Sequence, residues 1–197
     1  MKLKDFDFRL IMSEAFLENE VKCQNEECPC ADFKTLIYGE EAVLQFSDLA
    51  FSDLEAQIDL FTGYKDKKGQ KIYENDIVLM TLNDYKKEKD TIYKKIDSIY
   101  YTKGKGFILS NVLDNKINLD DDFCENCCEV IGNIHEDKDL LAYLIKQEKA
   151  YAKEYSNNPH LYPDNLFDKK QEELCIRFEK ELEALLQKRS NNETSRL

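Results

Sequence analysis

The sequence contains only two histidines, and neither His135 nor His160 belongs to a known catalytic or zinc-binding motif. No apolar run approaches the roughly 18 residues of a membrane span, and the N-terminus lacks the uninterrupted apolar core of a signal peptide. Gly104 and Gly106 lack the third glycine and the following helix of a phosphate-binding loop, so they predict a turn. These absences predict a protein without enzyme activity and without membrane contact, located in the cytoplasm of a bacterial host cell.

An odd number of cysteines, seven, argues against a frame of disulfides and agrees with a reducing compartment. Six of them fall in two polar segments, and Cys124-Glu125-Asn126-Cys127 has the CxxC spacing with which two thiolates reach one zinc ion. The sequence therefore offers a structural zinc held by Cys28, Cys30, Cys124 and Cys127. Free or buried thiols are the alternative, because nearby carboxylates raise thiol pKa values, and a redox role is a third option.

The net charge is −12, and the excess acid is concentrated in two stretches. Residues 1–60 carry 14 acidic and 5 basic groups, and residues 117–136 carry 6 acidic groups and no basic one. Such a chain repels phosphate, which disfavours direct binding of nucleic acid and favours a protein partner with a basic surface. Acidity that serves only solubility is the alternative. The candidate partner-binding residues are Asp120, Asp121, Asp122, Glu125, Glu26 and Glu27.

The segment from Leu60 to Met80 contains two turn patterns between apolar runs. Asp66-Lys67-Lys68-Gly69 predicts a type I turn, with Gly69 at positive φ. Asn75 is expected in the left-handed region, which Asn visits at low cost. The run Ile77-Val78-Leu79-Met80 predicts a buried strand.

Strands are also expected at residues 6–12, 58–62, 91–102, 106–112 and 128–134, with a hairpin loop at Lys103-Gly104-Lys105. Residues 34–38 and 42–46 predict a further hairpin, and residues 120–122 an acidic loop. Residues 13–21 predict a short helix, and residues 23–30 a loop.

From Asp137 the apolar period becomes helical. Asp137 is expected to cap a helix that ends at Asn157-Asn158-Pro159, and Asp164 a second helix before a frayed tail from Ser190. The apolar stripe of the second helix can pack on the first helix, on the β-domain or on a second copy of the chain, since an apolar face must be buried. A homodimer would use Phe167, Leu174, Phe178, Leu182 and Leu185.

Two blocks of the sequence carry a resemblance. Thr62 to Val78 and Glu129-Val130-Ile131-Gly132-Asn133-Ile134 resemble the YopX family of phage and prophage proteins, and Phe8-Arg9 is similar to the start of the family's FRAW motif. Tyr64, Asn75 and His135 stand where the family commonly has Leu, Gly and an exposed Tyr. The resemblance implies a compact β-rich domain encoded by a mobile element, and it supplies no catalytic residue.

We therefore expect an α+β protein with a β-rich, SH3-like barrel domain over residues 1–136, followed by a helical hairpin and tail over residues 137–197. The functional hypothesis is a non-enzymatic phage accessory protein. It would bind and inhibit a host protein that handles nucleic acid or serves in defence, of the restriction or CRISPR type, through its acidic surfaces. The alternative is an assembly module that oligomerises through the C-terminal helices.

Overall fold

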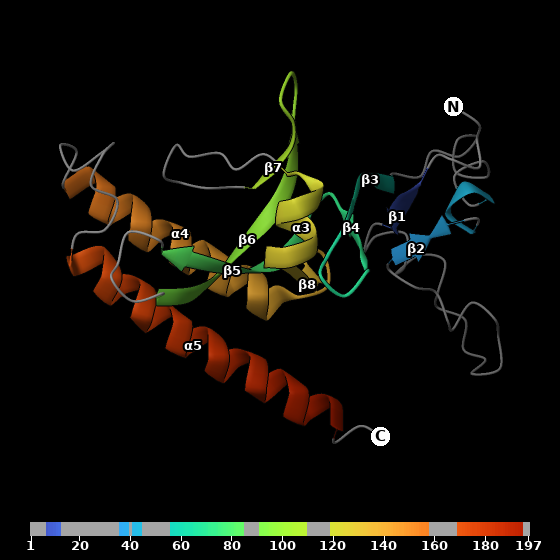
Figure 1. The fold of residues 1–197 in the computed structure, drawn as a ribbon. Helices are drawn as coiled ribbons and strands as arrows, with labels where there is room; N and C mark the ends of the chain where they lie inside the picture. Colours follow the sequence, from blue (N-terminus) through green and yellow to red (C-terminus); the bar gives the residue numbers. More distant parts are fainter. Residues whose placement is uncertain are drawn as a thin grey trace.

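The computed structural model describes residues 7–12, 36–39, 41–44, 56–84, 91–109, 119–157 and 169–194. The fold is α+β, as predicted, with an antiparallel sheet that curls into a half-barrel and two long C-terminal helices (Figure 1). In the described ranges, no helix has the combination of length and apolar character that a membrane span requires.

The described residues form eight strands in two four-stranded sheets. The first has the order β2 (Leu36–Tyr38), β1 (Phe8–Met12), β3 (Ala56–Lys65), β4 (Lys71–Tyr73). The second has the order β7 (Gly106–Leu109), β6 (Thr91–Thr102), β5 (Asp76–Asp84), β8 (Cys128–Asn133). Among these strands β4 and β8 are sheet edges, each hydrogen-bonded to one neighbour, so the half-barrel is not closed and the SH3-like topology stays a prediction.

Strand β5 is buried on both faces, which explains its uninterrupted apolar run. Val78 and Met80 pack on one face with Cys124 of helix α3 (Asp121–Cys127). Ile77 and Leu79 pack on the other face against helices α4 (Lys138–Asn157) and α5 (Lys169–Thr194). Alternate side chains of one strand thus join the two halves of the core.

Both turns predicted around the central segment are confirmed. Gly69 has φ +80° and its N–H donates to the Asp66 carbonyl oxygen at 2.8 Å. Asn75 has φ +64° and is the only described residue other than glycine at positive φ. Asp and Asn at these positions bend the backbone locally, which is why the turns can be predicted without any tertiary information.

The two C-terminal helices contact each other in antiparallel order (Figure 1). Arg189 near the end of α5 forms ion pairs with Asp137 and Asp139 at the start of α4, whereas the Tyr151 hydroxyl and the Cys175 sulfur meet at the other end, 3.2 Å apart. The connecting residues 158–168 lie outside the described ranges, so the hairpin stays a prediction.

The close approach of β8 and α4 requires glycine at position 132. A Cβ atom placed there would lie 2.3 Å from Oδ2 of Asp137. That oxygen accepts the N–H of Asn133 at 2.8 Å, so the Asp137 side chain ties the helix to the strand. Asp137 directly precedes the helix, as predicted, and its carbonyl oxygen accepts the Leu141 N–H at 2.9 Å.

Four local predictions were wrong. Residues 41–44 are helical, not a strand, and Ala42 packs there against Phe8 and Leu10 of β1. The acidic loop is the start of helix α3, because Asp120 caps it and two acidic residues stabilise its first turn. Helix α5 continues through the predicted tail to Thr194. His135 is not exposed, as described below. The predicted helix at 13–21 and the loop at 23–30 lie outside the described residues.

Candidate functional site

A buried arginine joins the two sheets. The Nε of Arg9 on β1 donates to Oδ2 of Asp59 on β3 at 2.9 Å, and its Nη1 donates to Oδ1 of Asp76 on β5 at 2.6 Å. Its Nη2 donates to the Glu74 carbonyl oxygen at 2.8 Å, and its guanidinium lies 5.4 Å from the centre of the Tyr73 ring. Because Arg9, Asp59 and Asp76 are each at most 2% exposed, these charges depend on one another for solvation.

Asp59 is the better compensated of the two carboxylates. Besides the hydrogen bond from Arg9, its Oδ1 accepts a hydrogen bond from Nδ2 of Asn75 at 2.7 Å, and its Oδ2 is hydrogen-bonded to Nε2 of His135 at 3.0 Å. Burial acts to raise the pKa of Asp59, but the hydrogen bond from His135 and the charge of Arg9 outweigh it, and the pKa is lowered. For Asp76, burial dominates over Arg9 and raises the pKa to about 6. The charge on Arg9 is retained, because the attraction of Asp76 and Asp59 outweighs burial and raises its pKa.

A third buried carboxylate, Asp66, fixes the β3–β4 turn to β8. Asp66 is 2% exposed, and its Oδ1 accepts the N–H groups of Lys68 at 2.9 Å and Gln70 at 2.8 Å. Its Oδ2 accepts the N–H of Val130 on β8 at 2.9 Å. One side chain therefore shapes the turn and attaches it to the second sheet.

The same turn makes two further contacts with β8. The N–H of Lys67 donates to the Cys128 carbonyl oxygen at 3.0 Å, and Glu129 forms ion pairs with both Lys67 and Lys68. Burial raises the pKa of Glu129, but the hydrogen bonds and charges of the two lysines outweigh it and lower the pKa.

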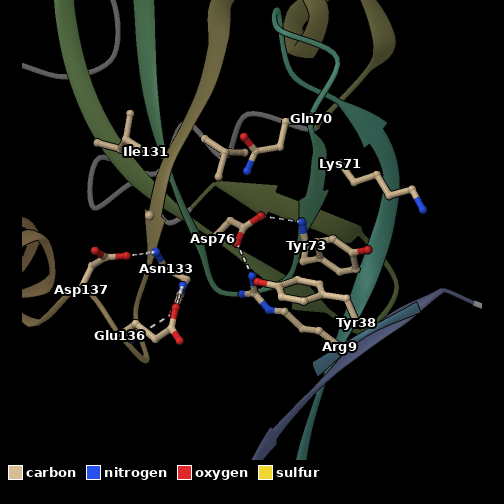
Figure 2. Close-up of a pocket in the computed structure, with 12 residues that line it drawn as sticks. Arg9, Tyr38, Gln70, Lys71, Tyr73, Asp76, Ile131, Asn133, Glu136 and Asp137 are labelled. Atoms are coloured by element: carbon tan, nitrogen blue, oxygen red, sulfur yellow. Dashed lines mark hydrogen bonds and ion pairs between the residues drawn. The ribbon is translucent and has the colours of Figure 1, made fainter. Parts of the chain in front are cut away.

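The edge strands β4 and β8 border a cavity of about 570 Å³, within the size range of ligand sites (Figure 2). We call it the edge cleft. Both sheets and the β8–α4 turn contribute to its walls. It is lined by Arg9, Tyr38, Gln70, Lys71, Tyr73, Asp76, Val130, Ile131, Gly132, Asn133, Glu136 and Asp137.

Helix α3 displays the acidic residues predicted to bind a partner. Asp120 caps the helix by accepting the Phe123 N–H at 2.8 Å, and Asp120, Asp121, Asp122 and Glu125 are all exposed. None of these four carboxylates forms an ion pair with a residue in the described part of the chain. Glu26 and Glu27 lie outside the described residues.

Two of the four predicted zinc ligands, Cys124 and Cys127, lie in the described ranges, three positions apart on helix α3. Cys124 is fully buried in the core beside Val78 and Met80, whereas Cys127 is partly exposed. Cys28 and Cys30 fall on residues that the structure does not describe. The described ranges contain no group of three or more His, Cys, Asp or Glu side chains arranged for a metal ion, and the four-thiolate site stays a prediction.

Of the three ways to bury the apolar stripe of the second helix, the structure shows packing on the first helix and on the β-domain. Phe178 and Leu182 are 2% and 1% exposed in the cluster with Ile77, Leu79 and Tyr143. Leu174 and Leu185 are partly buried against the same cluster, and Phe167 lies outside the described residues. Homodimerisation through these five residues stays a prediction, and two of them are already covered within one chain.

We call the buried contacts between the two sheets the junction. The sequence did not reveal that Arg9 and His135 take part in it. The side chain of His135 is only 13% exposed and contacts Asp59, although the family resemblance implied an exposed position. The similarity of Phe8-Arg9 to the FRAW motif was the one available indication for Arg9. Its partners Asp59 and Asp76 lie 50 and 67 positions away, beyond the reach of local patterns.

Comparison with known proteins gives one assignment. A search of curated proteins finds no match. The family model described as YopX protein matches residues 17–142, well over half of the chain, and includes both blocks that carry the resemblance. Arg9 precedes the matched residues. The chain therefore belongs to the YopX family.

Proposed function

We propose that this protein is a non-enzymatic phage accessory protein that binds a basic surface of a host protein through helix α3. The favoured target is a host protein that handles nucleic acid, including defence systems of the restriction or CRISPR type. Occupation of a basic groove by carboxylates would exclude the phosphates that normally bind there, and the target would be inhibited. Membership of the YopX family supports the part of the proposal that describes a phage-type protein.

The observation that carries the proposal is the contrast between the clustered carboxylates of α3 and six acidic residues elsewhere in the chain. Asp7, Glu129, Asp137, Asp139, Glu181 and Glu183 all form ion pairs with lysine or arginine of the same chain. The α3 carboxylates form none with the described residues, although they are clustered within six positions. They are therefore available to cations of another molecule.

The scaffold presents these carboxylates on a fixed element. Cys124 on the inner side of α3 is 0% exposed, and the Cys128 N–H donates to the Cys124 carbonyl at the end of the helix. Asp121 and Glu125 are four residues apart and share one face of the helix. A rigid arrangement lowers the entropy that binding would otherwise lose.

The test is a pull-down of the tagged full chain from its bacterial host at increasing salt. We expect one stoichiometric partner, whose retention falls steeply with ionic strength. The double variant Asp121→Lys with Glu125→Lys should lose this partner. The matched control Glu173→Lys with Glu179→Lys changes the net charge equally on α5 and should retain it. Recovery of only the protein itself would contradict the proposal.

A second candidate is the assembly module predicted from the helices. It is favoured by Ile145 on α4 and Ile176 on α5, which are 40% and 46% exposed. Light scattering during size-exclusion chromatography distinguishes the two. A stable oligomer that dissociates in Ile145→Ser with Ile176→Ser, and that retains no host partner, would favour assembly.

A further inference from the structure

Backbone groups on both walls of the edge cleft are already bonded within the chain. The Tyr73 N–H donates to Oδ2 of Asp76 at 2.7 Å, and the Val130 N–H donates to a carboxylate of the β3–β4 turn at 2.9 Å. The N–H of Asn133 donates to the Asp137 side chain at 2.8 Å, and its carbonyl oxygen accepts the Asp137 N–H at 3.1 Å. An occupant of the cleft must therefore be recognised mainly by side chains.

The two cationic side chains of the edge cleft have ionic partners. Arg9 is 2% exposed and forms ion pairs with Asp59 and Asp76. Lys71 forms an ion pair with Asp7, and Figure 2 shows its side chain directed away from the other labelled residues of the cleft. Within the described lining, an anionic ligand would find no cation without a partner, so the cleft does not suit an anion.

The carboxylate of Asp76 lies between the two walls of the edge cleft (Figure 2). The single positive charge of Arg9 is shared between Asp59 and Asp76. Burial outweighs the charge of Arg9 and raises the pKa of Asp76 to about 6, so this carboxylate is incompletely compensated. Above that pH Asp76 is ionised, and its charge attracts a cation placed in the cleft more strongly than a charge in water would.

Glu136 adds a second carboxylate to the edge cleft. Its side chain is exposed in the turn between β8 and α4. Among the described residues its Oε2 accepts only the Asn133 amide, at 3.3 Å, and the side chain has no ionic partner there. An occupant would thus meet one carboxylate that is accessible and has no cation.

An aromatic side chain is present on the opposite wall. Tyr38 is 46% exposed, and its ring packs at an angle of 69° against Tyr73 with centroids 5.7 Å apart. Figure 2 shows Tyr38 and Glu136 on opposite sides of the cleft. A cationic group between them would gain a cation–π contact from one wall and an ion pair from the other.

We infer that the edge cleft binds a small organic cation, with a guanidinium or primary ammonium group placed between Glu136 and the ring of Tyr38. The volume of about 570 Å³ suits a small molecule, and the bonded backbone groups leave a peptide chain few partners. This site is separate from helix α3 and does not depend on the function proposed for that helix.

The test is a titration of the isotope-labelled full chain with n-butylguanidinium, followed by NMR at neutral pH and fixed ionic strength. We expect saturable shift changes at the amides of Ile131, Gly132 and Glu136, which border the cleft. n-Butylammonium should affect the same amides, because it carries the same charge. n-Pentanol has a similar alkyl chain without a charge and should bind at least about tenfold more weakly than either cation.

Variants of the protein locate the site. Glu136→Gln keeps an oxygen that can accept the Asn133 amide, and we expect about two- to fivefold weaker binding of n-butylguanidinium because the pair is exposed. Glu136→Lys should weaken binding at least about tenfold, and Tyr38→Leu about two- to fivefold. Glu173→Gln on α5 is the matched control and should bind like the wild type. Thermal unfolding of each variant confirms that the fold is retained.

Four results would overturn the inference. Equal affinity of n-butylguanidinium for wild type and Glu136→Lys would exclude the cleft, and equal binding of n-pentanol would show that the charge is not recognised. Shift changes confined to helix α3, and lost in Asp121→Lys with Glu125→Lys, would assign the cation to that helix. An acetylated and amidated Gly-Arg-Gly peptide that binds at least about tenfold more tightly than n-butylguanidinium would replace the small molecule by an arginine of a partner protein.

Discussion

Carboxylate side chains have opposite environments in two regions of the molecule, the junction between the two sheets and helix α3. At the junction Asp59, Asp66 and Asp76 are buried and accept hydrogen bonds from several donors each. On α3 the carboxylates are exposed and have no ionic partner among the described residues. A buried carboxylate stabilises the fold only through its donors, whereas an exposed one is solvated and adds little. Substitutions in the two regions should therefore separate stability from binding.

The largest effect is expected from Arg9→Met. This change leaves Asp59 and Asp76 buried without their cation, which costs about 3–5 kcal/mol. Urea unfolding followed by circular dichroism measures the loss. Lys71→Met is the matched control, because its ion pair with Asp7 is exposed and should contribute less than about 1 kcal/mol. A loss below about 1 kcal/mol for Arg9→Met would mean that the junction is not held by these charges.

A smaller loss is expected from Asp66→Asn. The amide retains one oxygen for Lys68 and Gln70, but its NH₂ group then faces the Val130 N–H, which loses its acceptor. Loss of a charge-assisted hydrogen bond costs about 1.5–3 kcal/mol. Hydrogen exchange at Val130, measured by NMR, should become faster than in the wild type, and unchanged protection would refute the contact.

Asp97 on β6 extends the comparison, because its carboxylate is buried but has fewer hydrogen-bond donors than Asp59. Its Oδ1 accepts the Ser98 N–H at 2.9 Å, its Oδ2 forms an ion pair with Lys95 at 3.7 Å, and burial raises its pKa to about 7. The folded state therefore holds this proton more tightly than the unfolded chain. The contribution of Asp97 to stability is fully present below the unfolded-state pKa of 3.8, and it is lost as the pH rises from there through about 7.

We predict that Asp97→Asn gains stability relative to the wild type as the pH rises from 5 to 7, by roughly 1–3 kcal/mol. Urea unfolding at several pH values measures this difference. Asp121→Asn, an exposed position, should show no such trend. A constant difference between Asp97→Asn and wild type would show that Asp97 does not titrate in this range.

The smallest effect on stability is expected from Asp121→Asn with Glu125→Gln on α3. Exposed carboxylates without ion pairs contribute little, so the free energy of unfolding should change by less than about 0.5 kcal/mol. The cap residue Asp120 is left intact in this variant. A loss above about 2 kcal/mol in urea unfolding would mean that these residues support the fold.

Local chemistry made part of the fold predictable. The turn at Asp66, the left-handed Asn75 and the apolar run of β5 each depend on neighbours within a few positions, and all three are confirmed. Helix α3 was predicted as a loop, although Asp120 followed by two acidic residues matches a cap and first turn. The error came from treating the three aspartates only as charge.

The junction and the edge cleft could not be predicted in the same way. Arg9 meets partners on two other strands, and His135 reaches Asp59 from 76 positions away, so these contacts exist only after the sheets have assembled. The stripe of α5 illustrates the same limit. Its period predicts a buried face, but only tertiary packing decides whether α4, the sheet or another chain covers it.

The most direct test of the central claim, that α3 carries the partner-binding carboxylates while the buried ones hold the fold, is a quantitative binding measurement. The partner recovered from the host is titrated against wild type, Asp121→Lys with Glu125→Lys, and Glu173→Lys with Glu179→Lys at fixed ionic strength. The account predicts an affinity at least about tenfold weaker for the α3 variant alone, with its unfolding free energy within about 1 kcal/mol of wild type. Equal affinity of the three proteins would contradict it.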